Sequence, residues 1–295
     1  MEHNAGIGRK AFVIFNYIFC IFVAIACIMP LLHLLAVSLS SKNAVFSGHV
    51  LFWPVEFTLD SYRIVVRDSQ FFNSYLVSIC RAALGWFIQL TMTVLAAYPL
   101  NLKKSMFPAR QLFVWYFMLT MFFSGGLIPT YLVVEATGLI DSIWALVLPG
   151  AVPIFNIILM KNFMKGLPDS LMESAYIDGA SHFTTLLRII IPLCKASIAT
   201  VSLFCILWHW NAWFDGMIYI KNMALKPLQT YLRSIIIVDS SVSDAALELE
   251  EIIDNVTADS ANGAKIFLAL IPIMCIYPFL QKYFTKGIIL GSVKG

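Results

Sequence analysis

Charged residues are scarce in this sequence of 295 residues, and their scarcity argues against an ordinary soluble domain. Asp, Glu, Lys and Arg make up 13% of the chain, whereas soluble globular domains have about 25%. Hydrophobic residues make up 60% of the chain, and the mean hydropathy is +0.82. The net charge of +3 is too small to indicate binding to nucleic acid. The composition therefore predicts a protein whose main solvent is lipid.

Patterns of catalytic and metal-binding residues are also missing. The six cysteines include no CxxC pair and five of them lie in apolar runs, so neither a metal site nor a disulfide framework is indicated. The five histidines are scattered and form no HExxH motif. No phosphate-binding loop of the form GxxxxGK followed by Ser or Thr occurs. We therefore expect no catalytic residue, metal or cofactor on this chain, which disfavours a membrane enzyme.

Long apolar runs dominate what is present. A membrane-spanning helix needs about 20 mostly apolar residues, and six windows qualify: 12–37, 73–98, 112–134, 142–160, 197–220 and 266–284. The first run is too long for the core of a signal peptide, so we expect a retained span. The third window is the most continuous. Prolines predict kinks in the fourth and sixth windows, at Pro149, Pro153, Pro272 and Pro278. These windows predict an all-α, polytopic membrane protein with six transmembrane helices.

Lys and Arg concentrate on one side of the predicted membrane. If the N-terminus is cytoplasmic, the cytoplasmic segments hold twelve of these residues and the outer segments hold six. Because cytoplasmic loops carry an excess of basic residues, both termini are predicted to be cytoplasmic. We expect a cytoplasmic N-terminus at 1–11 and a single transmembrane domain at 12–295. Its cytoplasmic loop covers residues 161–196, and its extracellular loops cover 38–71 and 221–265.

The long cytoplasmic loop contains signals for two short helices joined by a glycine corner. Ser170 and Glu173 have the spacing of a capping box, in which each side chain bonds the other residue's backbone N–H. Gly179 suits a left-handed C-terminal cap. Ser181 can cap a second helix that should end before Pro192. The first helix would present a small apolar face to a partner's groove, made by Leu171, Met172, Ala175 and Tyr176.

This loop resembles the EAA loop of the permease subunits of bacterial ABC importers. The family pattern is roughly Glu-Ala-Ala, two residues, Asp-Gly-Ala, and later Ile-x-x-Pro. The residues that match it are Glu173, Ala175, Asp178, Gly179, Ala180, Ile189 and Pro192. Ser174 replaces the middle alanine of the pattern.

Further segments resemble the carbohydrate-importing members of that family, such as maltose-type transporters. Residues 210–214 (Trp-Asn-Ala-Trp-Phe) resemble their Trp-Asn motif, and residues 277–287 with 291–295 resemble their C-terminus. Residues 123–131 (Phe-Ser-Gly-Gly-Leu-Ile-Pro-Thr-Tyr) resemble the subgroup that handles larger or plant-derived oligosaccharides. The resemblance covers the second to the sixth span.

The resemblance implies a type I ABC importer permease fold and a role as one half of a translocation path for an oligosaccharide. The implied partners are a second permease subunit, two nucleotide-binding ATPase subunits and an extracellular solute-binding protein, in a bacterial cytoplasmic membrane. ATP and Mg would be bound by the partner ATPase. Alternating access would be driven through the coupling residues, which would be Glu173, Ala175, Asp178, Gly179, Ala180 and Pro192.

Aromatic and polar residues of the fifth window are the candidate substrate path. Trp208, His209, Trp210 and Asn211 lie near the middle of this window, where polar groups usually face the bundle interior or a water-filled path. The indole rings could stack on sugar rings, and Asn211 could bond hydroxyls. Alternatively, His209 and Asn211 could bond neighbouring helices as packing contacts. Arg81, near the start of the second window, is expected to snorkel toward the interface.

Two other kinds of transporter stay open at this point. An ABC importer permease for amino acids or peptides would share the coupling loop, and only the carbohydrate-type segments argue against it. An ion-coupled secondary transporter would favour acidic residues inside the spans and repeated halves. The six windows lack Asp and Glu except at their edges, and no internal repeat is visible. The secondary transporter is therefore the weaker alternative.

Overall fold

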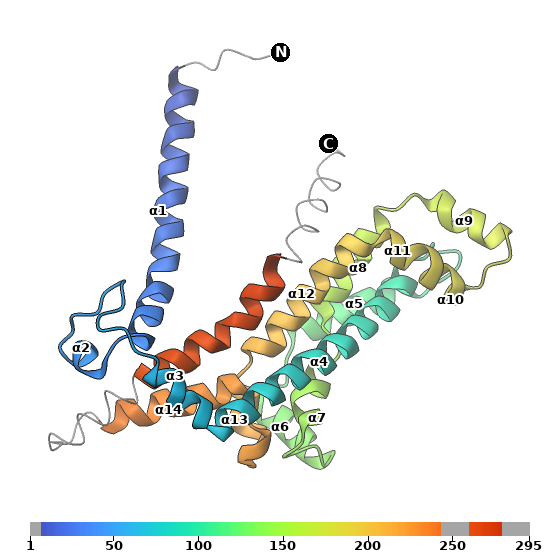
Figure 1. The fold of residues 1–295 in the computed structure, drawn as a ribbon. Helices are drawn as coiled ribbons and strands as arrows, with labels where there is room; N and C mark the ends of the chain where they lie inside the picture. Colours follow the sequence, from blue (N-terminus) through green and yellow to red (C-terminus); the bar gives the residue numbers. More distant parts are fainter. Residues whose placement is uncertain (1–6, 243–259, 279–295) are drawn as a thin grey trace. The chain divides into compact units, whose positions relative to one another are not determined.

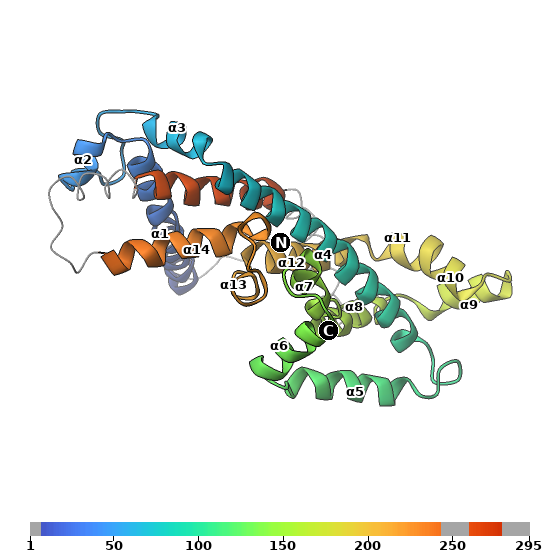
Figure 2. The same ribbon diagram turned by 90° about the horizontal axis from the view of Figure 1, so that it is seen from below.

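The computed structural model describes residues 7–242 and 260–278, and every regular element of these residues is helical. Three of the described helices are long and apolar enough to cross a membrane, or up to six if each bent helix pair counts as one span. The all-helical membrane fold predicted from the apolar windows is confirmed. The chain divides into two compact units (Figures 1 and 2).

The first unit comprises residues 1–71 and 234–270. Its helices are α1 (Ile7–Ser38), α2 (Lys42–Phe46), α3 (Asp60–Arg67), most of α14 (Leu228–Val242) and the first part of the last helix (Ser260–Pro278). Within this unit Lys265 Nζ lies 2.7 Å from an Asp68 carboxylate oxygen. Both side chains are largely buried, so this ion pair ties the last helix to the end of α3.

The second unit comprises residues 72–233 and 271–295 and carries both candidate sites. Its helices are α4 (Ser69–Asn101), α5 (Arg110–Phe122), α6 (Leu127–Ala136), α7 (Ile143–Val147), η1 (Leu148–Gly150), α8 (Ile154–Lys165), α9 (Asp169–Ile177), α10 (His182–Thr185), η2 (Leu186–Ile190), α11 (Ile191–Leu193), α12 (Lys195–Asn211), α13 (Phe214–Tyr219) and η3 (Met223–Leu225). Helices α9 to α11 lie at one end of this unit, and α6, α7 and α13 lie at the other (Figure 1).

Two of the predicted spans are broken where the sequence predicted continuous helices. The third window divides into α5 and α6, which meet at 111°. The backbone turns at Gly126, whose φ of +87° favours glycine. The fifth window divides after Asn211, where Ala212 is extended and α13 begins at Phe214. Of the three bent helix pairs, α5 with α6 has the sharpest angle, and the predicted continuity of the third window is wrong.

The proline positions of the other windows behave differently from one another. The fourth window bends by 49° between Gly150 and Ile154, as Pro149 and Pro153 predict. The last helix runs through Pro272 without a break. Its described part, Ser260–Pro278, starts before the predicted window, and the end of that window lies outside the described residues.

The two predicted extracellular loops are partly helical. Residues 38–71 contain α2 and α3, and residues 221–265 contain η3, α14 and the start of the last helix. Residues 243–259 of the second loop lie outside the described residues. The side of the membrane on which the two loops lie remains a prediction.

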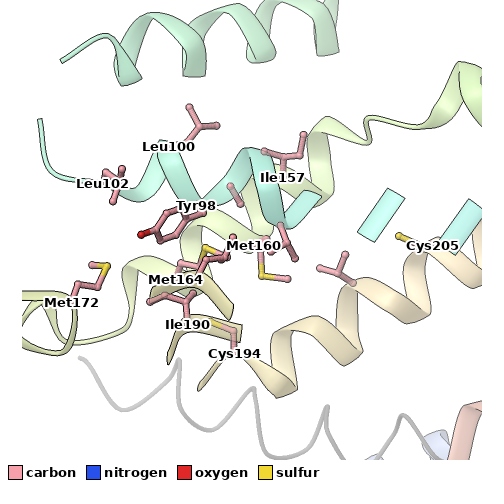
Figure 3. Close-up of a cluster of buried hydrophobic side chains, with 14 residues drawn as sticks. Tyr98, Leu100, Leu102, Ile157, Met160, Met164, Met172, Ile190, Cys194 and Cys205 are labelled. Carbon is pink, nitrogen blue, oxygen red and sulfur yellow. The ribbon is translucent and has the colours of Figure 1, made fainter. Parts of the chain in front are cut away.

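The core of the second unit joins the middle of the bundle to the α9 end. Figure 3 shows Tyr98, Met160 and Met164 pointing toward one another beside Ile190 and Cys194. These side chains come from α4, α8, η2 and the start of α12, and all are at least nine-tenths buried. Since lipid is as apolar as these side chains, close packing is what favours their association within the membrane. The core therefore connects the predicted cytoplasmic loop to the spans through direct contacts.

Candidate functional site

The predicted cytoplasmic loop turns at Gly179, whose φ of +78° lies in the left-handed region. Glycine adopts this conformation without the steric penalty that a Cβ brings. The Gly179 N–H donates to the Tyr176 carbonyl at 3.1 Å, and the Ala180 N–H donates to the Ala175 carbonyl at 2.9 Å. These bonds satisfy carbonyls at the end of α9. The predicted left-handed cap is confirmed.

The helix starts on either side of Gly179 were predicted with unequal success. Ser181 caps α10 by accepting a hydrogen bond from the Thr184 N–H at 3.2 Å, as predicted. The capping box of Ser170 and Glu173 is wrong. Helix α9 has Pro168 at its N-cap and no side-chain cap bond, because the helix begins one residue before Ser170.

Glu173 instead pairs with Lys103, which follows α4. Lys103 also lies 3.5 Å from Asp169, so two acidic side chains of α9 face one lysine. The hydrogen bond and charge of Glu173 raise the pKa of the Lys103 ammonium above its ordinary value of 10.5. All three side chains are about half exposed, so solvent screens the pairing. Glu173 is thus held toward its own chain by a long-range contact that its spacing did not predict.

The helix after Gly179 does not end before Pro192, contrary to the prediction. It widens into the π-helical turn η2 and continues as α11 through Pro192 to Leu193. Proline lacks an N–H, and its ring clashes with the carbonyl four residues earlier in a regular helix. A widened turn just before Pro192 accommodates both effects.

One face of α9 is anchored to the bundle. Met172 belongs to the core of the second unit, and Ala175 is buried on the same helix. The Tyr176 hydroxyl lies 3.0 Å from the Tyr98 hydroxyl of α4 and 3.1 Å from His182 Nδ1. The apolar face predicted for a partner's groove therefore packs mostly on its own chain. The exposed apolar side chains of this region are Leu171, Ile177, Phe183 and Leu187.

A stripe of buried residues runs along one face of α4. It recurs at every fourth position, which places its members on one side of a helix. The members are Arg81, Gly85, Gln89, Thr93 and Ala97. Three of them, Arg81, Gly85 and Gln89, contact residues of the cavity region that are far away in the sequence. This i, i+4 recurrence of polar and small residues is visible in the sequence and indicates a buried face of α4.

Arg81 is completely buried, so the predicted snorkelling is wrong. Its guanidinium forms a two-bond ion pair with Asp215 and donates to the Ala212 carbonyl at 3.1 Å. A buried guanidinium requires such partners because removing a charge from water is costly. The pair fixes the non-helical link between α12 and α13 against α4.

The four predicted substrate-path residues lie at the end of α12, not at the middle of a span, and they divide into two kinds. His209 and Trp210 are buried. The His209 ring lies against Gly85, where a Cβ would overlap it, and Trp210 packs edge-on against Tyr75. Trp208 and Asn211 are exposed and line cavities. The structure therefore supports packing roles for His209 and Trp210, whereas Trp208 and Asn211 remain candidates for the substrate path.

Two cavities lie beside the bend of the fourth window. The inner cavity, nearer α9, has a volume of about 440 Å³ and is lined by Gln89, Asn156, Phe155, Phe204, Trp208 and Gly150, among others. The outer cavity, nearer α13, has a volume of about 390 Å³ and is lined by Asn211, Trp213, Asp215, Tyr219, Trp208 and Gly150, among others. Sequence reasoning missed Gln89 and Asn156, whose polar side chains enter an otherwise apolar wall.

No three His, Cys, Asp or Glu side chains of residues 7–242 and 260–278 gather as a metal site would require. The cavities instead combine carboxamides with aromatic rings, which suits the binding of a polar ligand with apolar faces.

Comparisons with known proteins agree with this geometry. The family model of the binding-protein-dependent transport system inner membrane component matches residues 81–290. The polygalacturonan/rhamnogalacturonan transport system permease protein YtcP of Bacillus subtilis is 37% identical over 97% of this chain and 99% of its own length.

Two solved structures share the fold. One is a bacterial ABC transporter involved in the import of the acidic polysaccharide alginate, with a TM-score of 0.85 and 30% identity over 96% of this chain and 99% of the other. The second is a bacterial alginate ABC transporter in complex with an alginate pentasaccharide-bound periplasmic protein. Its TM-score is 0.57, with 14% identity over 92% of this chain and 93% of the other. The chain belongs to the family of inner membrane components of binding-protein-dependent transport systems.

Proposed function

We propose that this permease carries an oligosaccharide and that its own cavities form part of the path. The observation that carries the proposal is the wall chemistry of the two cavities. Trp208 offers a flat apolar face, as does the side of Trp213 that Arg233 does not cover, and Gln89, Asn156 and Asn211 offer carboxamides. Sugar rings present apolar C–H faces and many hydroxyls, so both kinds of group have a counterpart on such a ligand.

The related proteins support the same cargo class. The printed names of the relative and of the first solved structure refer to polygalacturonan or rhamnogalacturonan and to alginate. Polygalacturonan and alginate are chains of sugar acids, so galacturonate oligomers are the first probes to test. A free amino acid would be small for two cavities of about 440 and 390 Å³.

Coupling to ATP hydrolysis would enter at α9. Its exposed residues Glu173, Asp178 and Gly179 are available to an ATPase partner, while Met172 and Ala175 transmit its motion to the core. Tyr176 adds a direct bond to α4. Since interiors are closely packed, a displacement of α9 would move α4 and α8 with it rather than being absorbed.

The proposed assembly contains a second permease subunit, two ATPase subunits that bind ATP and Mg, and an extracellular binding protein. The second solved structure, a complex with a periplasmic binding protein, supports the last of these. The chain would cross a bacterial cytoplasmic membrane with both termini inside. Closure of the ATPases on ATP would move α9 and open the cavities outward, and hydrolysis would return them inward.

Uptake by the reconstituted transporter tests the proposal. The chain, its partner permease, the ATPases and the binding protein are placed in liposomes with ATP inside, and galacturonate oligomers are offered outside. Maltodextrins and peptides of similar mass serve as comparison cargoes. ATP-dependent uptake of a saccharide, and not of peptides, is the expected result. Uptake of peptides alone would reject the carbohydrate assignment.

A further inference from the structure

The inner and outer cavities share one wall, made by Trp208 and Gly150. The indole packs directly on the glycine backbone, since a Cβ built on Gly150 would lie 2.7 Å from Trp208 Cη2. No larger residue at position 150 would permit this contact without displacing the ring. The two cavities therefore meet at the contact between Trp208 and Gly150.

The two sides of this wall differ in how firmly they are held. Gly150 ends η1 at the bend of the fourth window, and the Gln89 amide donates to its carbonyl at 2.8 Å. Trp208 is 49% exposed. Its indole N–H makes no hydrogen bond to any residue within the described ranges, and its ring contact there is an edge against His209. The glycine side is thus fixed, and the indole is the side that can move.

The inner cavity has the groups that a sugar unit requires. Its volume of about 440 Å³ lies in the range of small-molecule sites. Asn156 is only 7% exposed. Its amide donates to the Cys205 sulfur at 3.5 Å, and sulfur is a weak acceptor. The rings of Phe155, Phe204 and Trp208 also line this cavity. A buried carboxamide with so weak a partner is well placed to exchange it for a ligand hydroxyl.

We propose that the inner cavity is a second sugar-unit site and that Trp208 is the partition which a cargo chain displaces to reach it. The inference rests on the proposed oligosaccharide cargo. Linked sugars longer than one cavity can occupy both only after the indole has left Gly150. The cargo would then be held at two successive units, with the indole between the two positions.

Cysteine reporters in the assembled transporter test the partition. The native cysteines of this chain are replaced, and a single reporter is introduced as Phe204→Cys in the inner cavity or Asn211→Cys in the outer one. A membrane-impermeant thiol reagent is then added outside. With Trp208 in place, the inner reporter should react slowly. With Trp208→Ala the inner reporter should react about tenfold faster, which corresponds to about 1.4 kcal/mol. The reaction rate of the outer reporter should change little.

Two further variants separate the partition from general loosening. Trp144→Ala is the matched control, because Trp144 is 44% exposed on α7 and lines neither cavity. It should leave the inner reporter slow. Gly150→Ala should accelerate the inner reporter with the indole still present, because the added methyl displaces the ring. Equal labelling of the inner reporter in all of these backgrounds would overturn the partition.

Protection by cargo tests the second site. Galacturonate oligomers of increasing length are added with the binding protein to the two reporters, with Trp208 in place. Protection of both reporters by the longer oligomers supports the proposal. Protection of Asn211→Cys alone at every length overturns the inner site and leaves the proposed function standing. If neither reporter is protected and no uptake is observed, both the second site and the proposed oligosaccharide cargo are rejected.

Discussion

The α9 end and the cavity end of the second unit are stabilised by different kinds of contact. At the α9 end, caps and a left-handed glycine act between residues a few positions apart, as at Gly179 and Ser181. At the cavity end, the decisive contacts join distant segments. Arg81 and Asp215 are 134 residues apart, and Gln89 and Gly150 are 61 apart. The turn at the first end is locally determined, although long-range contacts anchor α9 to the bundle, whereas the geometry of the second end depends on the assembled bundle.

Removing the buried guanidinium should produce the largest effect. Arg81→Ala leaves Asp215 without its partner, and breaking a buried pair costs about 3 kcal/mol. The expected result is loss of thermal stability and of uptake, measured on the purified complex. Arg63→Ala is the control, since the Arg63–Asp60 pair is exposed, with 76% and 67% of the two side chains accessible. If Arg81→Ala were as harmless as Arg63→Ala, the cavity end would not depend on its long-range contacts.

Gly179→Asp should abolish transport while the chain still inserts into the membrane. The position has φ of +78° with open space around a Cβ, so the local cost is backbone strain of about 1 kcal/mol. Gly138→Asp is a matched control, with φ of +69° and equal open space, but at the other end of the unit. Both variants should lose similar stability in a melting experiment. Equal uptake by the two would contradict the coupling role of Gly179.

Tyr176→Phe should weaken coupling more than stability. The change removes a hydroxyl that meets Tyr98 and His182, a net loss of about 1 kcal/mol. We expect less cargo transported per ATP hydrolysed, measured in liposomes. Tyr116→Phe, at an exposed position of α5, is the comparison. An unchanged ratio in the first variant would show that α9 acts on the bundle by packing alone.

The smallest effect is expected at the Lys103–Glu173 contact. The contact raises the pKa of Lys103 in the folded protein above its value in the unfolded chain. The stabilisation of the folded state is therefore complete below the pKa of the unfolded chain and is lost as the pH rises through the pKa of the folded protein. Lys103→Met should therefore be slightly less stable than the parent at pH 8, and the difference should vanish well above pH 10.5. Thermal melts at the two pH values measure this. A difference that grows at high pH would contradict the assignment.

The residues that were predicted well share one property, which is that their partners are close in sequence. Gly179 as a left-handed cap and Pro149 with Pro153 as a bend follow from backbone geometry alone. The capping box failed because α9 begins before Ser170, and Glu173 pairs instead with Lys103, 70 residues away. The snorkelling prediction failed because the partner of Arg81 lies on another helix. In both cases the competing contact was outside any local window.

By itself the sequence determined the solvent of this protein, its helical class, the approximate apolar runs and the short glycine corner. These depend on composition and on neighbouring residues, whose physics acts within one or two helical turns. Only the tertiary structure decided that the third and fifth runs are broken, that Arg81 is buried and that Trp208 lines two cavities. A cavity wall or a buried ion pair is formed by segments that only folding brings together, so no local pattern encodes its geometry.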